Sequence, residues 1–364
     1  MKNKIILSIS LVFIGLFVYT SLHKEVLDIS NKIAVLLPIT GDASIYGESA
    51  KNAAILADNG EGQILIEDTN LSGVKALSAL QKIEILEKSK VKVAISFSSG
   101  ETLALCPTTE KEHILLLSSG SSPAISSCGK MTFSNFPSDT YQAGVLAEKL
   151  KESREVIVLY MENDYGTGVY NEFKNKYVGK IDSFAYLPGQ TDYRTMLSSL
   201  KSKMANKGNP QGFTLLLISQ PKEASIILSQ ANQLDISPSL IYGTDSLKDE
   251  SFISKIPKSY IGKLIVVSPN EYLGSEQINF RDAYKSKFNT DPSAYADYVY
   301  DNIKLAKKVL HACPQMQDSC VLGYMKTLNS LGSTGNIFFG KSQSAQNKEY
   351  NFFTVVQGHF VGSK

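Results

Sequence analysis

The feature that most constrains this chain is a repeated alternation of short apolar segments and helical segments, in two consecutive series. The stretch Lys32–Ala57 opens the first series, with a continuous apolar run at Ile33–Leu37 that ends at Pro38 and Gly41. Such a run is typical of a strand buried on both faces, and the following helix carries alanines at helical spacing and can be capped by Ser44. At 364 residues the chain is long enough for two domains.

Strands are expected at 33–37, 63–68, 91–97, 114–117 and 131–136, and again at 156–160, 181–187, 213–218, 240–242 and 264–268. The tail is expected to hold helices at 284–288, 295–311 and 321–331 and a last strand at 352–356. Strands that alternate with helices form parallel sheets covered on both faces. The chain is therefore predicted to be an α/β protein with two doubly wound, Rossmann-like lobes, and the cleft between them is the expected ligand site.

The N-terminus has an export pattern. Lys2 and Lys4 precede an apolar run from Ile5 to Leu22. Basic residues before an apolar core are typical of a signal peptide, but this run also reaches the length of ~18 residues at which a membrane span becomes possible. Residues 1–30 are therefore expected to be a cleaved signal peptide or an anchor to the inner membrane, and both place the rest in the periplasm or outside the cytoplasm.

Four cysteines, Cys106, Cys128, Cys313 and Cys320, agree with export. An even number in an exported chain indicates disulfides, and four cysteines allow three connectivities, of which pairing between sequence neighbours is the simplest. The net charge of +2 gives no reason to expect nucleic acid as a partner. Neither cysteine pair has zinc-like spacing with the four histidines, so no metal site or cofactor is expected. Ser198 and Lys201 match a Ser-x-x-Lys pattern, but they lie on an expected amphipathic surface helix, and no enzymatic activity is expected.

Polar residues follow several expected strands at the edge where ligands bind in parallel sheets. They are Tyr46, the pair Ser98-Ser99, the run Ser119–Pro123 and Asp245. Ser98 with Glu101 forms a capping-box pattern, so structural roles stay open for the serines, as do a helix cap for Asp245 and lobe packing for Tyr46 and Tyr165. Two hydroxyl clusters at equivalent places in successive strand–helix units favour a shared polar site.

Motifs in a defined order resemble those of the type I periplasmic solute-binding proteins of the branched-chain amino-acid (leucine/isoleucine/valine) group, which feed ABC transporters. The motifs are Pro38-Ile39-Thr40-Gly41 with Tyr46-Gly47, Ser98-Ser99, Ser119 to Pro123, Asp164-Tyr165-Gly166 with Gly168, Asp192-Tyr193, Tyr300-Asp301, and Thr334-Gly335 with Ile337-Phe338. The resemblance implies two lobes joined by three crossovers, near Phe136, Ser268 and Gly335. Residues 31–136 and 270–335 would then form the first lobe, and residues 137–269 and 336–364 the second.

The resemblance also implies site residues. Ser98, Ser119 and Ser121 would hold the carboxylate of a small zwitterionic ligand, an amino acid or an amide-like compound, and Asp245 would pair with its ammonium group. Ser99 is a further candidate ligand-binding residue. Tyr46 and Tyr165 would wall the pocket, and Gln220 is the candidate contact where the family often has an aromatic residue. The implied role is non-enzymatic delivery of the ligand to an ABC transporter permease; the alternative is a membrane-tethered envelope sensor or interaction module that acts on another envelope membrane protein.

Overall fold

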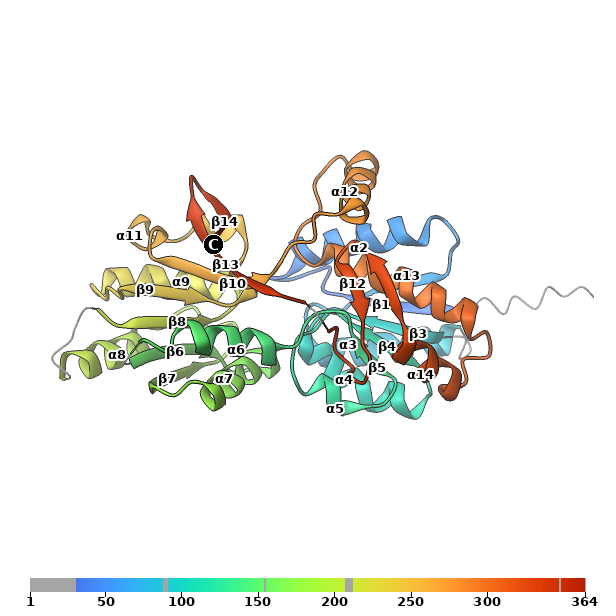
Figure 1. Cartoon of the computed structure of the whole chain (residues 1–364), viewed down its shortest axis with the longest axis horizontal. Coiled ribbons are helices and arrows are strands. Elements are labelled where there is room, and N and C mark those ends of the chain that lie inside the picture. The colour runs from blue at the N-terminus through green and yellow to red at the C-terminus, as the bar shows by residue number, and fades with distance from the viewer. Residues whose placement is uncertain (1–30, 88–90, 154, 207–211, 347, 364) are drawn as a thin grey trace, which may run out of the picture. The chain divides into compact units, whose positions relative to one another are not determined.

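The structure is a computed structural model that describes residues 31–363 apart from 88–90, 154, 207–211 and 347. Lys32–Lys364 form one unit, shown in Figure 1. The expected signal or anchor segment, including the apolar run 5–22, lies outside the described residues. Within the described ranges, no helix combines the length and the apolar character that a membrane crossing requires.

The first sheet has five parallel strands in the order β2-β1-β3-β4-β5. Its elements are β1 (Lys32–Leu37), α2 (Ser44–Asp58), β2 (Ile64–Asp68), α3 (Gly73–Leu86), β3 (Val91–Ser96), α4 (Ser99–Lys111), β4 (Leu115–Ser118), α5 (Ile125–Cys128) and β5 (Thr132–Ser134). Along β1, Ile33, Val35 and Leu37 pack in a core with α2 and α13 (Ala296–Ala312). Ala34 and Leu36 pack on the opposite face with α3 and α4. Burial on both faces explains the uninterrupted apolar run.

The second sheet has seven strands in the order β14-β13-β10-β9-β8-β6-β7. Its elements are α6 (Asp139–Lys149), β6 (Glu155–Met161), α7 (Asp164–Lys176), β7 (Lys180–Tyr186), α8 (Arg194–Asn206), β8 (Thr214–Ile218), α9 (Pro221–Gln233), β9 (Leu240–Gly243), the 3₁₀ helix η1 (Asp245–Leu247), α10 (Glu250–Ile253), α11 (Lys258–Ile261), β10 (Leu264–Pro269), β13 (Tyr350–Val356) and β14 (His359–Ser363). Helices α6 and α7 pack on one face, and α8 and α9 on the other. The expected α/β architecture with two lobes is confirmed.

The second sheet differs from a purely parallel one at one edge. Strand β13 runs antiparallel to β10, and β14 runs antiparallel to β13. Gln357 and Gly358 connect β13 to β14, and both have positive φ, 51° and 85°. Two residues with positive φ form the tight turn that suits the twist of a hairpin. Strand β14 therefore joins the sheet by a hairpin with β13, without a helix between the two strands.

After β10 the chain returns to the first sheet. Here it forms α12 (Ser275–Phe288), α13, α14 (Asp318–Thr327) and the hairpin β11 (Asn329–Gly332) with β12 (Gly335–Phe338). The helix expected over 321–331 therefore ends at Thr327, and its last residues form β11. Strand β11 pairs with β12 in a separate two-stranded sheet, which takes these residues out of the helix.

The third crossover of the chain, from the first sheet to the second, lies later in the sequence than Gly335. Ile337, Phe339 and Ala345 are buried in the core of the first sheet. The backbone N–H of Ala345 donates to the carbonyl of Ser134, the last residue of β5, at 2.8 Å. The apolar run after Gly335 thus stays with the first lobe, and the chain joins the second sheet only at β13. The first lobe therefore comprises the first sheet with α2–α5, α12–α14 and β11–β12. The second lobe comprises the second sheet with α6–α11 and η1.

Local capping agrees with the sequence at α4 and differs at α2. Ser98 caps α4, and its backbone N–H donates to the Glu101 carboxylate at 2.8 Å, so the expected capping box is present. Helix α2 instead begins at Ser44 itself, Ala43 occupies the cap position, and no side chain caps it. The prediction that Ser44 caps this helix is wrong by one position.

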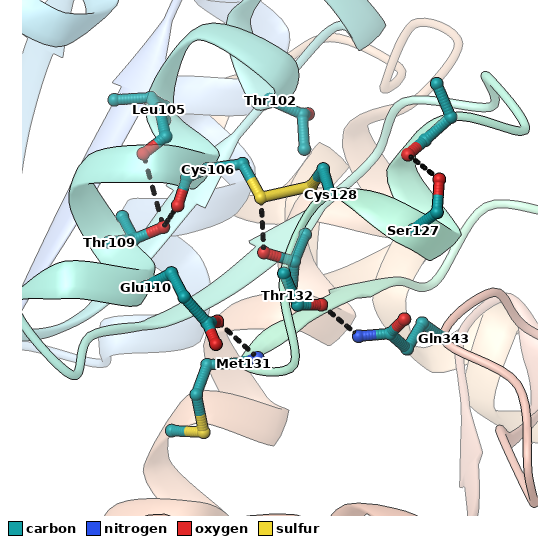
Figure 2. The surroundings of a disulfide bond; sticks show 12 residues. Thr102, Leu105, Cys106, Thr109, Glu110, Ser127, Cys128, Met131, Thr132 and Gln343 are labelled. Atoms are coloured by element: carbon teal, nitrogen blue, oxygen red, sulfur yellow. Dashed lines mark hydrogen bonds between the residues drawn. A yellow bond between two sulfur atoms is a disulfide. The ribbon is translucent and has the colours of Figure 1, made fainter.

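The four cysteines pair as sequence neighbours, Cys106 with Cys128 and Cys313 with Cys320. Figure 2 shows the first disulfide linking α4 to the short helix α5, with the Cys106 sulfur 3.4 Å from the Thr132 hydroxyl of β5. Nearby, the Glu110 carboxylate accepts from the backbone N–H of Met131 at 3.1 Å. The disulfide therefore links α4 to α5 and contacts β5, at one edge of the first sheet.

Candidate functional site

Asp245 occupies the position directly after β9 where the sequence predicts a ligand-contacting acid. It opens η1, is 7% exposed, and accepts hydrogen bonds from the Tyr165 hydroxyl at 2.8 Å and from the Gln142 side-chain amide. The cap position of its own short helix is occupied by Thr244, and the Asp245 carboxyl also accepts from the backbone of Ser246. Burial raises the pKa of the Asp245 carboxyl, and the hydrogen bonds from Gln142 and Tyr165 oppose that shift.

A second buried carboxyl, Asp139, lies in the same cluster. It is the first residue of α6 and is 0% exposed, and its Oδ2 accepts from the Ser121 hydroxyl at 3.0 Å. Burial raises the pKa of the Asp139 carboxyl well above its usual value, and the negative charge of Asp245 raises it further. Ser121 donates to Asp139, and Gln142, one helical turn after Asp139 in α6, donates to Asp245. Ser121, Asp139, Gln142, Tyr165 and Asp245 thus form one cluster.

The other predicted serines are engaged within the first lobe. Ser98 caps α4, and Ser99 Oγ accepts from the backbone N–H groups of Ser121 at 3.3 Å and of Ser122 at 3.1 Å. Ser119 Oγ accepts from the Asn302 side-chain amide at 3.3 Å. These hydroxyls hold the two polar loops together.

Tyr46 and Gln220 lie at the margin of the cluster. The Tyr46 hydroxyl donates to the Asp249 carboxylate of the second lobe, and its ring lies 5.9 Å from the Tyr295 ring. Burial raises the pKa of Tyr46, and the hydrogen bond with Asp249 adds to that shift. Gln220 is the residue before α9, is partly exposed, and its side chain makes no capping hydrogen bond.

A cavity of about 220 Å³ is lined by residues of both lobes and includes Asp245. Its aromatic wall residues are Phe136, Tyr272, Phe280, Tyr295 and Tyr298. Its charged wall residues are Asp245, Lys248, Glu271, Arg281 and Asp297. Lys248 and Glu271 form an ion pair of 2.6 Å, so these two wall charges neutralise each other. None of the predicted serines, Tyr46, Tyr165 or Gln220 is among its lining residues.

Sequence reasoning missed Asp139, Gln142 and Tyr295 as site residues. Asp139 follows Pro137-Ser138 and reads as the first turn of a helix, which it also is. Tyr295 has a φ of 70°, in the left-handed region that non-glycine residues rarely adopt. Its ring contacts Phe97 and Phe136 as well as Tyr46. A strained backbone at a cavity wall is a signal of function that only the structure reveals.

No group of three or more His, Cys, Asp or Glu side chains suited to a metal ion is found among the residues that the structure describes. The cluster combines the carboxyls of Asp139 and Asp245, the Gln142 amide and the Tyr165 hydroxyl, and it meets the aromatic cavity at Asp245. Such a lining can bind a small organic molecule with an apolar body and a hydrogen-donating end.

Comparisons with known proteins agree with the two-lobed fold. A model of the periplasmic binding protein family matches residues 30–359. The leucine-, isoleucine-, valine-, threonine- and alanine-binding protein of Pseudomonas aeruginosa is 24% identical over 356 residues, 90% of each chain. The structure of the leucine-binding protein LivK of Thermotoga maritima aligns with a TM-score of 0.77 at 21% identity, over 92% of this chain and 97% of that one. The substrate-binding protein LivJ of Streptococcus pneumoniae, in complex with isoleucine, aligns with a TM-score of 0.73 at 22% identity, over 91% and 99%.

Proposed function

Because the chain belongs to the periplasmic binding protein family, whose members bind solutes outside the cytoplasm, we propose that it captures a small ligand with an amino group and delivers it to an ABC transporter permease. The proposed ligand class is that of amino acids and related amides. By their names, the relatives described above bind leucine, isoleucine, valine, threonine and alanine, which supports this class for the present chain.

The observation that carries the proposal is the position of Asp245. It lies at the carboxyl end of β9, in a cavity lined by both lobes, with aromatic rings beside it. A carboxylate in such a cavity attracts the ammonium end of a ligand, and the rings accept its apolar part. Tyr165, hydrogen-bonded to Asp245, orients that carboxylate.

Closure of the two lobes around the ligand is the proposed mechanism. The lobes are connected by chain passages after β5, after β10 and before β13. Short connections of this kind allow hinge motion. The closed form would then present surfaces of both lobes to the permease.

A thermal-shift screen of the exported protein tests the function. The screen covers the amino acids, small amides, simple amines and short peptides. A true ligand at ~100 times its dissociation constant should stabilise the fold by roughly 2.7 kcal/mol. Asp245→Ala should abolish that shift, whereas Asp192→Ala, which changes an exposed carboxylate, should leave it unchanged. If none of these compounds raises the midpoint of unfolding, the solute-binding proposal fails.

A further inference from the structure

Helix α6 presents two buried hydrogen-bond acceptors that lack a donor. Asp139 and Gln142 lie one helical turn apart, and both are 0% exposed. Asp139 Oδ1 and Gln142 Oε1 have no hydrogen-bond partner in the described part of the chain. The Gln142 amide is oriented by its bond to Asp245, because a carboxylate oxygen accepts from the NH₂ group and leaves the carbonyl oxygen unused. Buried polar atoms are almost always paired, so these two acceptors indicate a missing donor.

The charges around these acceptors are negative. Burial and the charge of Asp245 raise the pKa of Asp139, and Glu172 adds to that effect. Of the two cations on the cavity wall, Lys248 pairs with Glu271 at 2.6 Å. Lys248 and, to a lesser extent, Arg281 lower the pKa of Glu271 against the effect of burial. At Asp297 the charge of Arg281 opposes the rise in pKa that burial and Asp301 cause. The wall cations thus act on other carboxylates, and the position beside Asp139 and Asp245 suits a positive charge.

The groups expected to hold a ligand carboxylate are already occupied by the protein. The backbone N–H groups of Ser119, Gly120, Ser121 and Ser122 donate to Ser96, Ser118 and Ser99. The Ser121 hydroxyl donates to Asp139. The N-terminal turn of α4 faces a carboxylate of the second lobe, because a Cβ built at Gly100 would lie 3.2 Å from Asp164 Oδ2. An incoming carboxylate would have to displace these contacts.

We propose that the physiological ligand is a small organic amine with a net positive charge, whose nitrogen donates to Asp139, Gln142 and Asp245. This inference rests on the proposed solute-binding function, and it replaces the amino acids and amides proposed above by amines that lack a carboxylate. A protonated amine supplies the missing donors and balances the two carboxylates. A zwitterion would bring a second negative group for which this cluster offers no unoccupied donor among the loop N–H groups of residues 119–122.

The test is a matched series of compounds titrated into the wild-type protein by calorimetry at pH 7. Leucine carries both charged groups, 3-methylbutylamine lacks the carboxylate, and 4-methylpentanoate lacks the ammonium. Straight-chain amines and diamines of three to eight carbons extend the series, and the amino acids with uncharged side chains serve as the zwitterionic arm. We expect the best amine to bind at least tenfold more tightly than any amino acid, and the carboxylates to produce no heat.

Variants then locate the site. Asp139→Asn keeps the shape of the side chain and removes its charge, and it should weaken amine binding at least tenfold. Asp282→Asn changes an exposed carboxylate of α12 and should have no effect. Should Asp139→Asn fail to fold, the order of affinities in the wild-type series still decides the question.

The outcomes separate the inference from the function. Tighter binding of an amino acid than of every amine would overturn the cationic ligand and leave solute binding intact. Equal amine affinity in folded Asp139→Asn and in wild type would overturn the assigned site. Binding of no compound in either arm would remove both the inference and the proposed function.

Discussion

At the start of α13, Asp297 faces the cavity, and Asp301 lies one helical turn behind it. Burial and the negative charge of Asp301 raise the pKa of Asp297 to about 6. Lys348 lies close by and donates to the Thr334 carbonyl at 2.6 Å. Burial lowers the pKa of Lys348 to about 8, although Asp301 and Asp297 oppose that shift. Lys348 lies just before β13, where the chain enters the second sheet for the last time. The charges of Asp297, Asp301 and Lys348 therefore affect the stability of this connection between the lobes.

The substitution Asp297→Asn tests the cost of the buried charge. The folded protein keeps the Asp297 proton up to about pH 6, whereas the unfolded chain loses it near 3.9. The stabilising contribution of the protonated form is therefore complete below about pH 4 and is lost as the pH rises through 6. We expect the variant to be more stable than wild type by about 1–2 kcal/mol at pH 7.5 and to lose this advantage near pH 4. Urea unfolding at both pH values measures the difference, and an advantage that persists at pH 4 would contradict the explanation.

Residue roles could be predicted from the sequence only where one short motif determines them. The Ser98 and Glu101 pair determines its own capping box, because both partners lie within one helical turn. Asp139 could not be recognised as a site residue, since its partners Ser121 and Asp245 come from distant parts of the chain. The role of Gln142 depends on Asp245 in the same way, and the two are 103 positions apart in the sequence.

At the scale of elements, the Cys106–Cys128 bond is the covalent link between α4 and α5. Cys106 is fully buried, whereas Cys320 of the other disulfide is exposed. The first bond spans 22 residues and the second spans 7. A longer closed loop restricts the unfolded chain more, so the first bond should contribute more to stability.

Replacing both cysteines of the first pair by alanine should lower the free energy of unfolding by about 3 kcal/mol, and the second pair by about 1 kcal/mol less than the first. The matched double variant of Cys313 and Cys320 is the control, because it removes a bond with little buried surface at Cys320. Guanidinium unfolding of the three oxidised proteins gives the comparison. A larger loss from the second pair would show that loop length and burial do not decide the contribution.

The inner strands β1, β3, β4 and β8 were predictable because their apolar runs are buried on both faces. The position at which the first lobe ends could not be predicted. The apolar run at Ile337–Phe339 packs against the first sheet, but its sequence does not indicate which of the two sheets it contacts. Hydrogen bonds from residues near Ala345 to Ser134 decide that question, and they join positions about two hundred residues apart. The strand β11 was hidden for a similar reason, since its pairing with β12 competes with continuation of α14.

For the whole molecule, two hydrogen-bonded contacts connect the α2 side of the first lobe to the second lobe. Tyr46 donates to Asp249, and Lys222 pairs with Asp42 at 2.7 Å. The ion pair is largely exposed on both sides and contributes little. The Tyr46 bond is partly buried and has a carboxylate acceptor, which makes it the stronger contact. Separation of the lobes at this place has to break it, so the bond favours the closed arrangement.

The substitution Tyr46→Phe should therefore weaken ligand binding without altering the cavity wall, since Tyr46 does not line the cavity. A hydrogen bond to a charged group is worth about 1.5–3 kcal/mol, so we expect the dissociation constant to rise about tenfold, mainly through faster release. Tyr141→Phe is the matched control, because the Tyr141 hydroxyl donates to Gln346 and Tyr141 is 43% exposed. Stopped-flow and calorimetric titrations with the compound identified by the screen measure both constants. Equal affinities of the two variants would mean that the Tyr46–Asp249 contact does not stabilise the ligand-bound form.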